Sequence, residues 1–440
     1  MNIGYESGGS TQRRRTRAAR QSQHLLSREP DDVPQVSRDN QRQNTDEILP
    51  VLHFERIFSR EGLFEAFLQL KEKNGPGAGI DGIKYDLLSN REAGIIAGQL
   101  AQVIQEGEYR PAATRAVKIP KPGKSEHRTL QLPVIGDRMV AKALLTALAP
   151  HLERLFLPGS HGFRRGHSFW GLFVDLEARL QQTGLTVVAT ADIRKAFDNV
   201  VISRAMRAFE RLFNEPAFRE QAFANVDEQD DQRLLKMIEV LMRGHDADRK
   251  VGIDQGSPFS PTILNVLLHY AHDVNHEKRE TPWFRYADNL VYLARDADAA
   301  RKLLRHTGNL LDKVKMTTKA ESVEVVDLAT ETLAAFGVNA HLQDNKLHFA
   351  LGEQPWSKLN EELRKLHEGR NSQELANCVI LGWANSYGPA CEREGKVIKK
   401  LARIAGENGF QEIDWSQVEN QLLNARRRFG ELRERATGRP

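Results

Sequence analysis

The chain has 440 residues, of which 40% are hydrophobic, and a formal net charge of +4. This length allows two to three domains of about 100–200 residues each. There is no apolar run of about 18 residues or more, and the basic N-terminus lacks an apolar segment, so we expect neither a membrane span nor a secretory signal. The two cysteines, Cys378 and Cys391, fit no zinc spacing. We therefore expect a cytoplasmic protein without a membrane partner.

Residues 1–46 are rich in Gly, Ser, Arg, Gln and Asp and show little apolar periodicity, which predicts a disordered basic arm. From Glu47 to Lys73 apolar residues recur at helical spacing and predict two short helices, and Leu87–Glu106 predicts another. Basic residues cluster in the arm, in residues 110–128 and near the C-terminus. Such clusters are typical of phosphate binding, the alternative being a solvated surface.

Val117–Ile135 alternates in strand fashion around KPGKSEH, which predicts a hairpin with this segment at its tip. Asp137 is expected to cap the next helix, whose apolar stripe runs from Val140 to Leu155. Further helices are predicted over residues 204–213, 231–242, 261–270 and 297–314.

Short strands are predicted over residues 323–326, 335–342 and 346–349. From Trp356 onward the pattern is helical, with breaks expected at Gly382 and at Gly388-Pro389. The coarse prediction is a mixed antiparallel sheet with helices on one side, followed by an all-helical C-terminal piece.

Two aspartates stand out for their positions. Residues 283–294, WFRYADNLVYLA, have the pattern of a β-hairpin with Asp288 at its tip. Residues 186–200, TVVATADIRKAFDNV, predict a buried strand that ends in Asp192 and is followed by a polar turn. These carboxylates form one magnesium site only if the sheet brings them together. Magnesium prefers a few carboxylates, substrate phosphates and water, and the main-chain carbonyl of Ile193 is a further candidate ligand.

Several further segments carry recognisable patterns. In chain order they are GIDGI (79–83), YRPAATRAVKIPKPGKSEHRTLQLPVIGDRMV (109–140), SHGFRRGHS (160–168), ADIRKAFDNV (191–200), GIDQGSPFSPTILN (252–265), FRYADN (284–289) and AFGV (335–338). In this order they resemble the GxDG element, fingers hairpin, SxGFRxGxS, first catalytic Asp, PQGxxxSPxLxN, F-x-RYADD and primer-grip segments of reverse transcriptases. The resemblance is to the bacterial group II intron-like lineage of that family.

The resemblance implies an α+β right-hand polymerase fold. Fingers are expected at residues 47–185, a palm with an antiparallel sheet and the catalytic site at 186–350, and a helical thumb at 351–440. Nothing past Trp356 has the cysteine or histidine clusters of an endonuclease domain. This favours a standalone, defence-associated reverse transcriptase that works with a structured noncoding RNA.

The resemblance also assigns roles in catalysis. Asp192, Asp288 and Asn289 occupy the catalytic positions, and Asp192, Ile193 and Asp288 are expected to hold two Mg²⁺ ions, with Mn²⁺ as an alternative. Two ions about 3.5–4 Å apart stabilise the attacking and leaving oxygens of phosphoryl transfer.

Other positions correspond to the nucleotide site. Lys121 and Arg128 would contact the incoming triphosphate, whose oxygens suit both cations. Backbone amides of residues 194–197 would cradle the same phosphates. Phe197 matches the ring that excludes a 2′-hydroxyl, although plain core packing is its alternative interpretation. Gln255 and Gly256 would border the nucleotide and template.

Three further positions complete the assignment. Gly337 would turn the backbone near the primer end, and Lys319 matches loosely the lysine of the next polymerase motif. The proline of PQG is replaced by Asp254, which either alters template choice or is a solvated loop charge.

Another departure is Asn289, which replaces the second aspartate of YADD and removes a charge from the metal site. Three hypotheses follow. The first is an RNA-directed DNA polymerase with an RNA template, dNTPs and a DNA product. The second is a polymerase of the same fold that needs no ordinary nucleic-acid template, and the third is a catalytically dead RNA-binding scaffold. Homo- or hetero-oligomers are compatible with each.

Overall fold

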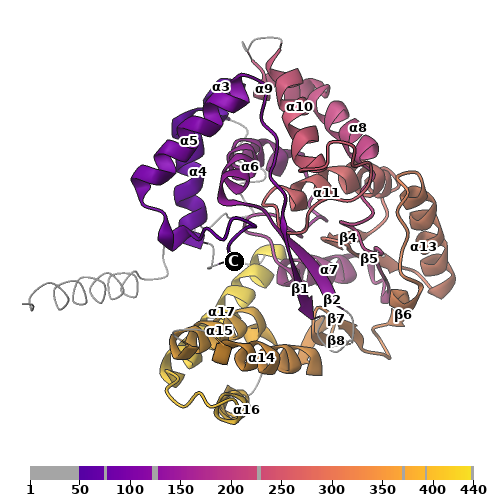
Figure 1. Cartoon of the computed structure of the whole chain (residues 1–440). Coiled ribbons are helices and arrows are strands. Elements are labelled where there is room, and N and C mark those ends of the chain that lie inside the picture. Colours follow the sequence, from indigo (N-terminus) through magenta and orange to yellow (C-terminus); the bar gives the residue numbers. More distant parts are fainter. Residues whose placement is uncertain are drawn as a thin grey trace, which may run out of the picture. The chain divides into compact units, whose positions relative to one another are not determined.

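The computed structural model describes residues 49–73, 77–120, 127–224, 229–368, 372–391 and 394–437. The predicted basic arm at residues 1–46 lies outside these ranges. Figure 1 shows the arrangement of the elements.

The first part of the chain is helical and is followed by a hairpin, as predicted. Its elements are α3 (Phe54–Ile57), α4 (Arg60–Lys73), η2 (Tyr85–Leu87), α5 (Asn90–Gln105), β1 (Arg115–Pro120), β2 (His127–Leu132) and α6 (Ile135–Leu155). Helix α5 begins with a capping box in which the Ser89 side chain and Glu92 satisfy each other's backbone amides. Strands β1 and β2 pair antiparallel.

The predicted capping role of Asp137 is wrong. Val134 is the N-cap of α6, and Asp137 is buried within the first turn. Its carboxylate accepts hydrogen bonds from the Tyr109 hydroxyl at 2.8 Å and from the Ala112 amide at 2.9 Å. The side chain therefore ties the segment before β1 to α6 instead of closing the helix end.

The central sheet has four antiparallel strands in the order β4-β5-β3-β6. Their bounds are β3 (Val187–Asp192), β4 (Trp283–Tyr286), β5 (Asn289–Ala294) and β6 (Glu324–Asp327). Both the predicted strand ending in Asp192 and the hairpin around Asp288 are confirmed.

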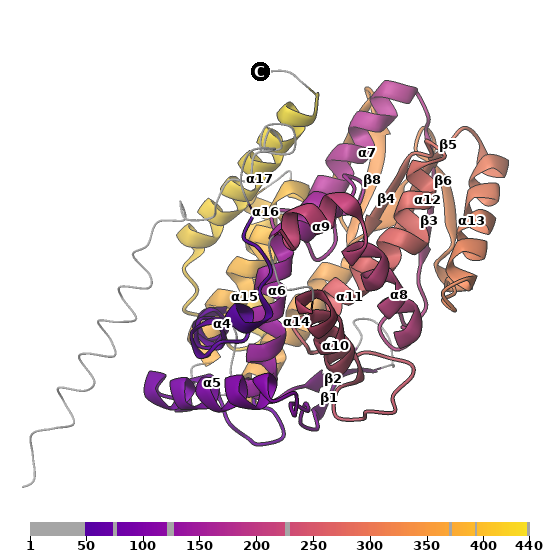
Figure 2. The same ribbon diagram turned by 90° about the horizontal axis from the view of Figure 1, so that it is seen from above.

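Helices cover both faces of this sheet, so the prediction of helices on one side is wrong. Val187 and Ala189 of β3 lie in one hydrophobic core, whereas Val188 lies in another that includes residues of α7 (Phe169–Thr183). In Figure 2 the strands lie between α7 and α13 (Ala297–Asp312). A strand with apolar residues on both faces, as in β3, requires cover on both.

The four helices predicted for this region are confirmed as α8 (Ile202–Phe213), α10 (Asp230–Arg243), α11 (Ser260–Leu268) and α13. Two short helices that were not predicted, α9 (Pro216–Ala222) and α12 (Val274–Glu277), lie between them. Between α11 and α12 the chain forms a π-helical turn, η3 (His269–Asp273).

A second small sheet contains β7 (Leu333–Ala335), β8 (Val338–Gln343) and β9 (Lys346–Leu351). The prediction of one strand over residues 335–342 is wrong, because Phe336 and Gly337 have φ angles of 55° and 84° and reverse the chain between β7 and β8. Such a turn favours glycine.

The C-terminal part is helical, as predicted. It contains α14 (Glu353–Lys365), η5 (Leu366–Glu368), α15 (Ser372–Tyr387), η6 (Gly388–Ala390), α16 (Glu394–Glu407) and α17 (Trp415–Thr437). The expected break at Gly388-Pro389 is confirmed, but Gly382 lies inside α15 and does not interrupt it.

Helix α17 joins two cores. Its first half packs in the C-terminal core through Leu422, whereas Phe429 packs with Trp170 of α7 at a ring-centroid distance of 5.0 Å. Arg433 then pairs with the buried Glu177 of α7 at 2.5 Å. The boundary expected at residue 351 stays a prediction, because α17 packs against elements on both sides of it.

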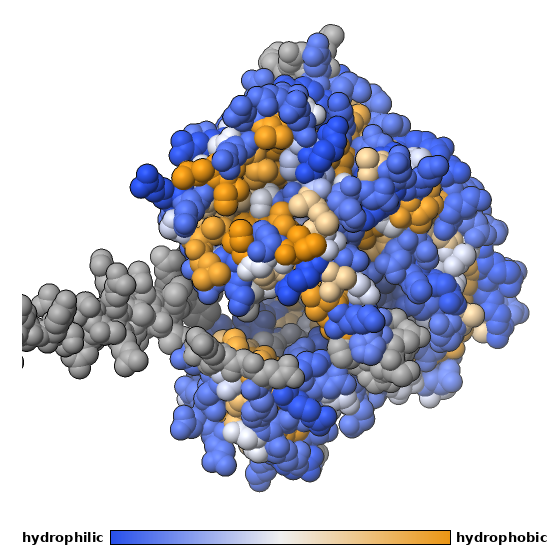
Figure 3. Space-filling view, viewed as in Figure 1, coloured by the Kyte–Doolittle hydropathy of each residue, from blue (hydrophilic) through white to orange (hydrophobic). Residues whose placement is uncertain are grey.

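Some hydrophobic residues lie on the surface. Figure 3 shows them gathered over α4 and α5, where Leu68 and Ile95 are 41% and 51% exposed. None of the helices in the described ranges has the length and apolar character needed to cross a membrane. The combination of antiparallel sheets with separate helical regions confirms the predicted α+β class.

Candidate active site

The sheet brings the two predicted aspartates together. Asp192 ends β3 directly opposite Asn289, the first residue of β5. Asp288 lies in the turn before β5, and its carbonyl accepts a hydrogen bond from the Ile193 amide at 3.0 Å. Both carboxylates therefore lie at the same end of the sheet.

The electrostatics reflect this proximity. Burial raises the pKa of Asp288, and the neighbouring Asp192 carboxylate raises it further, while Lys319 and Arg128 act in the opposite direction. Two close carboxylates disfavour each other's ionised form, which is the situation that a bound cation relieves.

Lys319 and Ser322 hold Asp192 from the other side. The Lys319 ammonium contacts the Asp192 carboxylate, and its amide donates to the Asp192 carbonyl at 2.8 Å. The Ser322 hydroxyl accepts from the Asp192 amide at 2.9 Å. Lys319, which the sequence matched only loosely, thus belongs to the site, and Ser322 was missed because it lies in a short polar segment without a pattern of its own.

The donor set suits a hard divalent cation. One carboxylate oxygen of Asp192, Oδ1, is buried, and no donor within the described ranges reaches it. The described residues contain no group of three or more His, Cys, Asp or Glu side chains arranged for a metal, and the residue next to Asp288 is Asn289. Magnesium accepts a ligand set of two carboxylates with additional oxygen atoms from the backbone and the substrate.

Asn289 makes only long contacts. Its amide nitrogen lies 3.4 Å from the Tyr286 carbonyl and 3.5 Å from Asp288 Oδ1. The amide thus neighbours the Asp288 carboxylate without fixing it firmly, and it adds no charge to the site.

A buried arginine supports the hairpin that carries Asp288. Arg285 is fully buried, and its guanidinium donates to Asp273 at 2.6 and 2.9 Å, to Asn265 and Ser160 at 2.8 Å each, and to the Ala287 carbonyl at 3.1 Å. The role of Arg285 was not predicted from the sequence. An arginine among the apolar side chains of WFRY was the available signal, since a buried charge needs a partner.

Asp273 is the counter-ion of Arg285. Burial alone raises the pKa of the Asp273 carboxyl, but the Arg285 charge and a 2.7 Å hydrogen bond with His272 outweigh it and hold this pKa well below its usual value. The pair is therefore ionised, and it anchors the hairpin to η3.

The hairpin tip also rests on the SHGFRRGHS segment. A Cβ atom at Gly162 would lie 2.0 Å from the Ala287 nitrogen, so only glycine fits there. The Gly162 carbonyl accepts from the Asn265 side chain at 2.8 Å. Three segments of the family pattern, far apart in the chain, thus meet beneath Asp288.

The predicted triphosphate contacts lie partly within the described ranges. Arg128 is exposed on β2, and its positive charge acts to lower the pKa of Asp288. Lys121 lies outside the described residues. Backbone amides of residues 194–197 were predicted to bind the triphosphate. The Arg194 amide instead donates to the Thr317 carbonyl at 2.8 Å, which leaves the amides of residues 195–197 for phosphate binding.

Phe197 is half-buried and packs against the first core. Its ring lies edge-on to Phe163 at a centroid distance of 6.0 Å. Phe163 is itself 52% exposed, so part of the Phe197 environment is open. Both the steric and the packing interpretations of Phe197 fit this position.

Gln255 and Gly256 connect the loop before α11 to neighbouring elements. The Gln255 amide donates to Asp198 at 3.0 Å. A Cβ atom at Gly256 would lie 1.9 Å from the Gln131 carbonyl oxygen of β2, so the absence of a side chain allows the loop and the hairpin to approach.

The acidic group at Asp254 is neutralised. Its carboxylate pairs with Arg249 at 2.7 Å, and the two side chains are 14% and 18% exposed. The interpretation of Asp254 as a solvated loop charge is wrong, because the carboxylate is paired and largely buried. An effect of Asp254 on template choice stays a prediction.

The predicted primer-grip turn contacts the hairpin that carries Asp288. Phe336 packs on Tyr286 at 5.4 Å and on Phe169 of α7 at 5.7 Å between ring centroids. A Cβ atom at Gly337 would lie 2.9 Å from Pro355 of α14. The turn therefore joins β4 to the first C-terminal helix.

Comparison with known families gives one match that covers more than half of the chain. Residues 119–349 match the family described as reverse transcriptase (RNA-dependent DNA polymerase). The matched range includes Asp192, Asp288 and the turn at Phe336 and Gly337.

Two curated proteins are similar to the chain. Protein YkfC of Escherichia coli is 28% identical over 240 residues, covering 53% of this chain and 60% of the relative. An uncharacterized 91 kDa protein in the cob intron of Schizosaccharomyces pombe is 24% identical over 312 residues, covering 69% of this chain and 35% of the relative. The chain thus spans less than two thirds of the length of either protein.

Solved structures of telomerase are more distant. The Candida albicans enzyme, determined with a fragment of telomeric RNA, aligns with a TM-score of 0.40 at 13% identity and covers 75% of this chain and 66% of its own. The Candida tropicalis enzyme aligns with a TM-score of 0.38 at 11% identity, with coverages of 56% and 58%.

Proposed function

The chain belongs to the reverse transcriptase family and has the right-hand polymerase fold, and we propose that it is an RNA-directed DNA polymerase. It would extend a DNA strand with dNTPs on an RNA template. The observation that carries the proposal is the pairing of Asp192 with Asp288 at one end of the sheet, within electrostatic range of Arg128.

Asp192, Asp288 and the Ile193 carbonyl would hold two Mg²⁺ ions, or Mn²⁺ in their place. Bound divalent cations supply charge stabilisation to the attacking and leaving oxygens of phosphoryl transfer. In the free protein Lys319 neutralises Asp192, so this ion pair must open before both oxygens of Asp192 become ligands.

The substrate side of the site would use the remaining predicted residues. Arg128 and Lys121 would bind the triphosphate, with amides of residues 195–197 beneath it. Phe197 would select against a 2′-hydroxyl, while Gln255 and Gly256 would border the nucleotide and template. The close approach of Gly256 to β2 supports this assignment, because it couples the loop to the strand that carries Arg128.

The biological setting is proposed from the resemblance to the group II intron-like lineage. The protein would act as a standalone, cytoplasmic reverse transcriptase in defence against phage. A structured noncoding RNA would serve as template, and assembly into homo- or hetero-oligomers is compatible with this role. The similarity to a protein encoded in the cob intron supports the lineage.

The two alternative functions have less support. Synthesis without an ordinary template was suggested by Asp254, but this charge is paired with Arg249 and does not face a template as a free carboxylate. A dead scaffold was suggested by Asn289, yet the carboxylate pair and its Lys319 and Ser322 contacts are intact.

Primer extension tests the activity directly. Purified wild type, Asp192→Asn and the exposed control Asp248→Asn are given a primed RNA template, dNTPs and Mg²⁺. We expect Asp192→Asn to lose at least about a thousandfold in rate, a loss of about 4 kcal/mol, and Asp248→Asn to match wild type. Equal rates in all three proteins would refute the assignment of the catalytic pair.

Sequencing of co-purified nucleic acid tests template and setting. Wild type and Asp192→Asn are isolated from cells with and without phage. New DNA complementary to one cellular RNA, present only with wild type, is expected. DNA unrelated to any RNA would favour untemplated synthesis, and identical profiles would favour the scaffold.

A further inference from the structure

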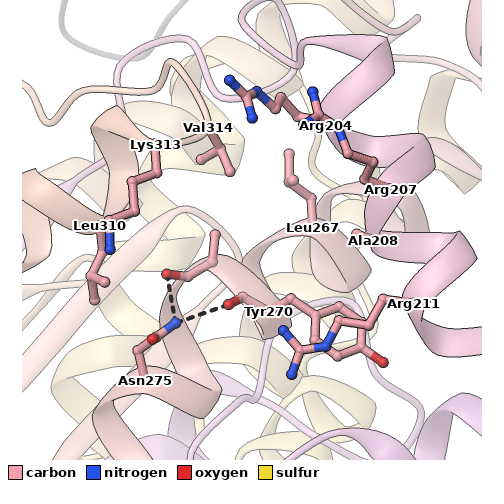
Figure 4. Close-up of a pocket in the computed structure, with 11 residues that line it drawn as sticks. Arg204, Arg207, Ala208, Arg211, Leu267, Tyr270, Asn275, Leu310, Lys313 and Val314 are labelled. Atoms are coloured by element: carbon pink, nitrogen blue, oxygen red, sulfur yellow. Dashed lines mark hydrogen bonds between the residues drawn. The ribbon is translucent and has the colours of Figure 1, made fainter. Parts of the chain in front are cut away.

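A cavity of about 340 Å³ lies between α8, α11 with η3, and the end of α13 (Figure 4). It is lined by none of the residues assigned above to catalysis, nucleotide binding or the primer grip. Its volume falls in the range of small-molecule sites, about 300–1,000 Å³.

Cations surround this cavity. Arg204, Arg207 and Arg211 follow one another at spacings of three and four residues, which places them on one face of α8. Lys313, directly after α13, faces them from the opposite side (Figure 4). Side chains from two separate elements therefore direct positive charge into one space.

These cations have no carboxylate partners among the described residues. The lining contains no Asp or Glu, and none of the four basic side chains forms an ion pair with a described residue. Glu215 reaches the lining only indirectly, by accepting a hydrogen bond from the Tyr270 hydroxyl at 2.9 Å. Like charges that converge without a counter-ion repel one another, and an anionic ligand would remove that repulsion.

The floor of the cavity is apolar and partly ordered in advance. Leu267, Leu310 and Val314 contribute to it, and the Arg211 guanidinium is held over the Tyr270 ring at 4.4 Å. A stacked guanidinium is oriented before a ligand arrives, so less rotamer freedom is lost on binding.

The π-helical turn η3 shapes this floor. It contributes Tyr270 and Ala271, and their carbonyls accept from the Asn275 side-chain amide at 2.9 and 3.2 Å (Figure 4). Single π turns within helices are frequent at functional sites. Here the turn places an aromatic residue opposite the basic face of α8.

The arrangement indicates the chemistry of the ligand. An apolar floor fits a planar or hydrophobic body, and the cations above it fit phosphate oxygens. Arg204 and Arg211 are about 10 Å apart along the helix axis, at 1.5 Å per residue, which exceeds the size of one phosphate. We propose that this cavity is a second binding site for a nucleotide unit with more than one phosphate, either a free nucleoside triphosphate or consecutive nucleotides of an RNA strand.

Photolabelling of the full chain tests the site by position. The probes are 8-azido-ATP and a short single-stranded RNA containing 4-thiouridine, each applied with EDTA present. The labelled residue within each peptide is located by fragmentation in the mass spectrometer, which separates this cavity from Arg128, Phe197 and Gln255. Failure of the proposed polymerase function therefore leaves this test unaffected.

We expect the labelled residues to lie within 204–211, 267–275 or 310–314. The variant Arg207→Gln/Lys313→Gln should lose at least about tenfold of that label, about 1.4 kcal/mol in affinity. The control Lys236→Gln/Lys302→Gln removes two exposed cations from α10 and α13 outside the cavity and should label like wild type.

Each outcome is decisive. Label from the ATP probe alone identifies a free nucleotide as ligand, and label from the RNA probe alone identifies a strand. Absence of label at these peptides in wild type with both probes overturns the proposal without reference to any variant. Equal label in wild type and both double variants overturns it as well.

Discussion

Arg285 and Asp273 form a fully buried ion pair in which Nε and Nη2 of the arginine lie 2.9 and 2.6 Å from the two carboxylate oxygens. The pair joins the strand before Asp288 to the π-helical turn η3. It thereby connects the hairpin that carries Asp288 to the helical layer beneath the sheet.

Asp273→Asn should destabilise the protein strongly. The substitution leaves the Arg285 charge buried without a counter-ion, which costs about 3–5 kcal/mol. Chemical denaturation monitored by circular dichroism measures the change. Asp298→Asn is the matched control, because its partner Arg301 and Asp298 itself are 58% and 84% exposed, and loss of this pair should cost less than about 1 kcal/mol. Similar losses in both variants would contradict the anchoring role.

Asp137→Asn should change the pH dependence of stability. Burial raises the pKa of Asp137 to about 6, whereas an unfolded chain has the ordinary value of about 4. The folded protein therefore binds this proton more tightly. Its contribution to stability is fully present below about pH 4 and is lost as pH rises through about 6.

The stability of wild type relative to Asp137→Asn should accordingly fall by up to about 3 kcal/mol between these pH values. Thermal unfolding of both proteins across the range measures the difference. Glu108→Gln, at an exposed position nearby, should show no such trend. A pH-independent difference between wild type and Asp137→Asn would refute the prediction.

Phe197→Val separates the two interpretations of this ring. If the ring excludes a 2′-hydroxyl, the preference for dNTPs over NTPs, measured as the ratio of kcat/KM values, should fall at least about tenfold, or about 1.4 kcal/mol. Phe163→Ala removes the neighbouring edge contact but keeps the Phe197 ring, so it should retain selectivity. Lower stability with unchanged selectivity in Phe197→Val would favour core packing.

Gly256→Ala should impair nucleotide binding. The new Cβ would meet the Gln131 carbonyl oxygen, so the loop or β2 must move, at a cost of about 1–3 kcal/mol. Because β2 carries Arg128, the KM for dNTPs should rise several-fold, by about 1 kcal/mol or more. Gly308→Ala on α13 has open space around the added atom and should leave KM unchanged. An unchanged KM in both variants would show that the contact is dispensable.

Asn289→Asp should strengthen the metal site. The added carboxylate would lie opposite Asp192 and next to Asp288, so the Mg²⁺ concentration for half-maximal activity should fall at least about threefold. The Mg²⁺ titration should be carried out at alkaline pH, where protons compete least with Mg²⁺ for the carboxylates. Asn309→Asp adds the same charge at an exposed position of α13 and serves as control. A higher Mg²⁺ requirement in Asn289→Asp would argue that the amide is needed as it stands.

The local pattern of the sequence determined much of this protein. Apolar alternation identified the strand that ends in Asp192 and the hairpin around Asp288, because side chains in strands alternate with a period of two. Helical periodicity located α8, α10 and α13, and the order of short motifs indicated the family. These features depend on neighbours within a few residues, so they can be read without the fold.

Only the tertiary structure decided which distant residues meet. Arg285 finds Asp273, Asn265 and Ser160, and Lys319 reaches Asp192, because packed elements fix distances that no local pattern encodes. Packing likewise decided that helices cover the second face of the sheet. The cations of α8 face Lys313 across a cavity for the same reason: periodicity sets the face of one helix, but the packing of other helices decides what that face meets.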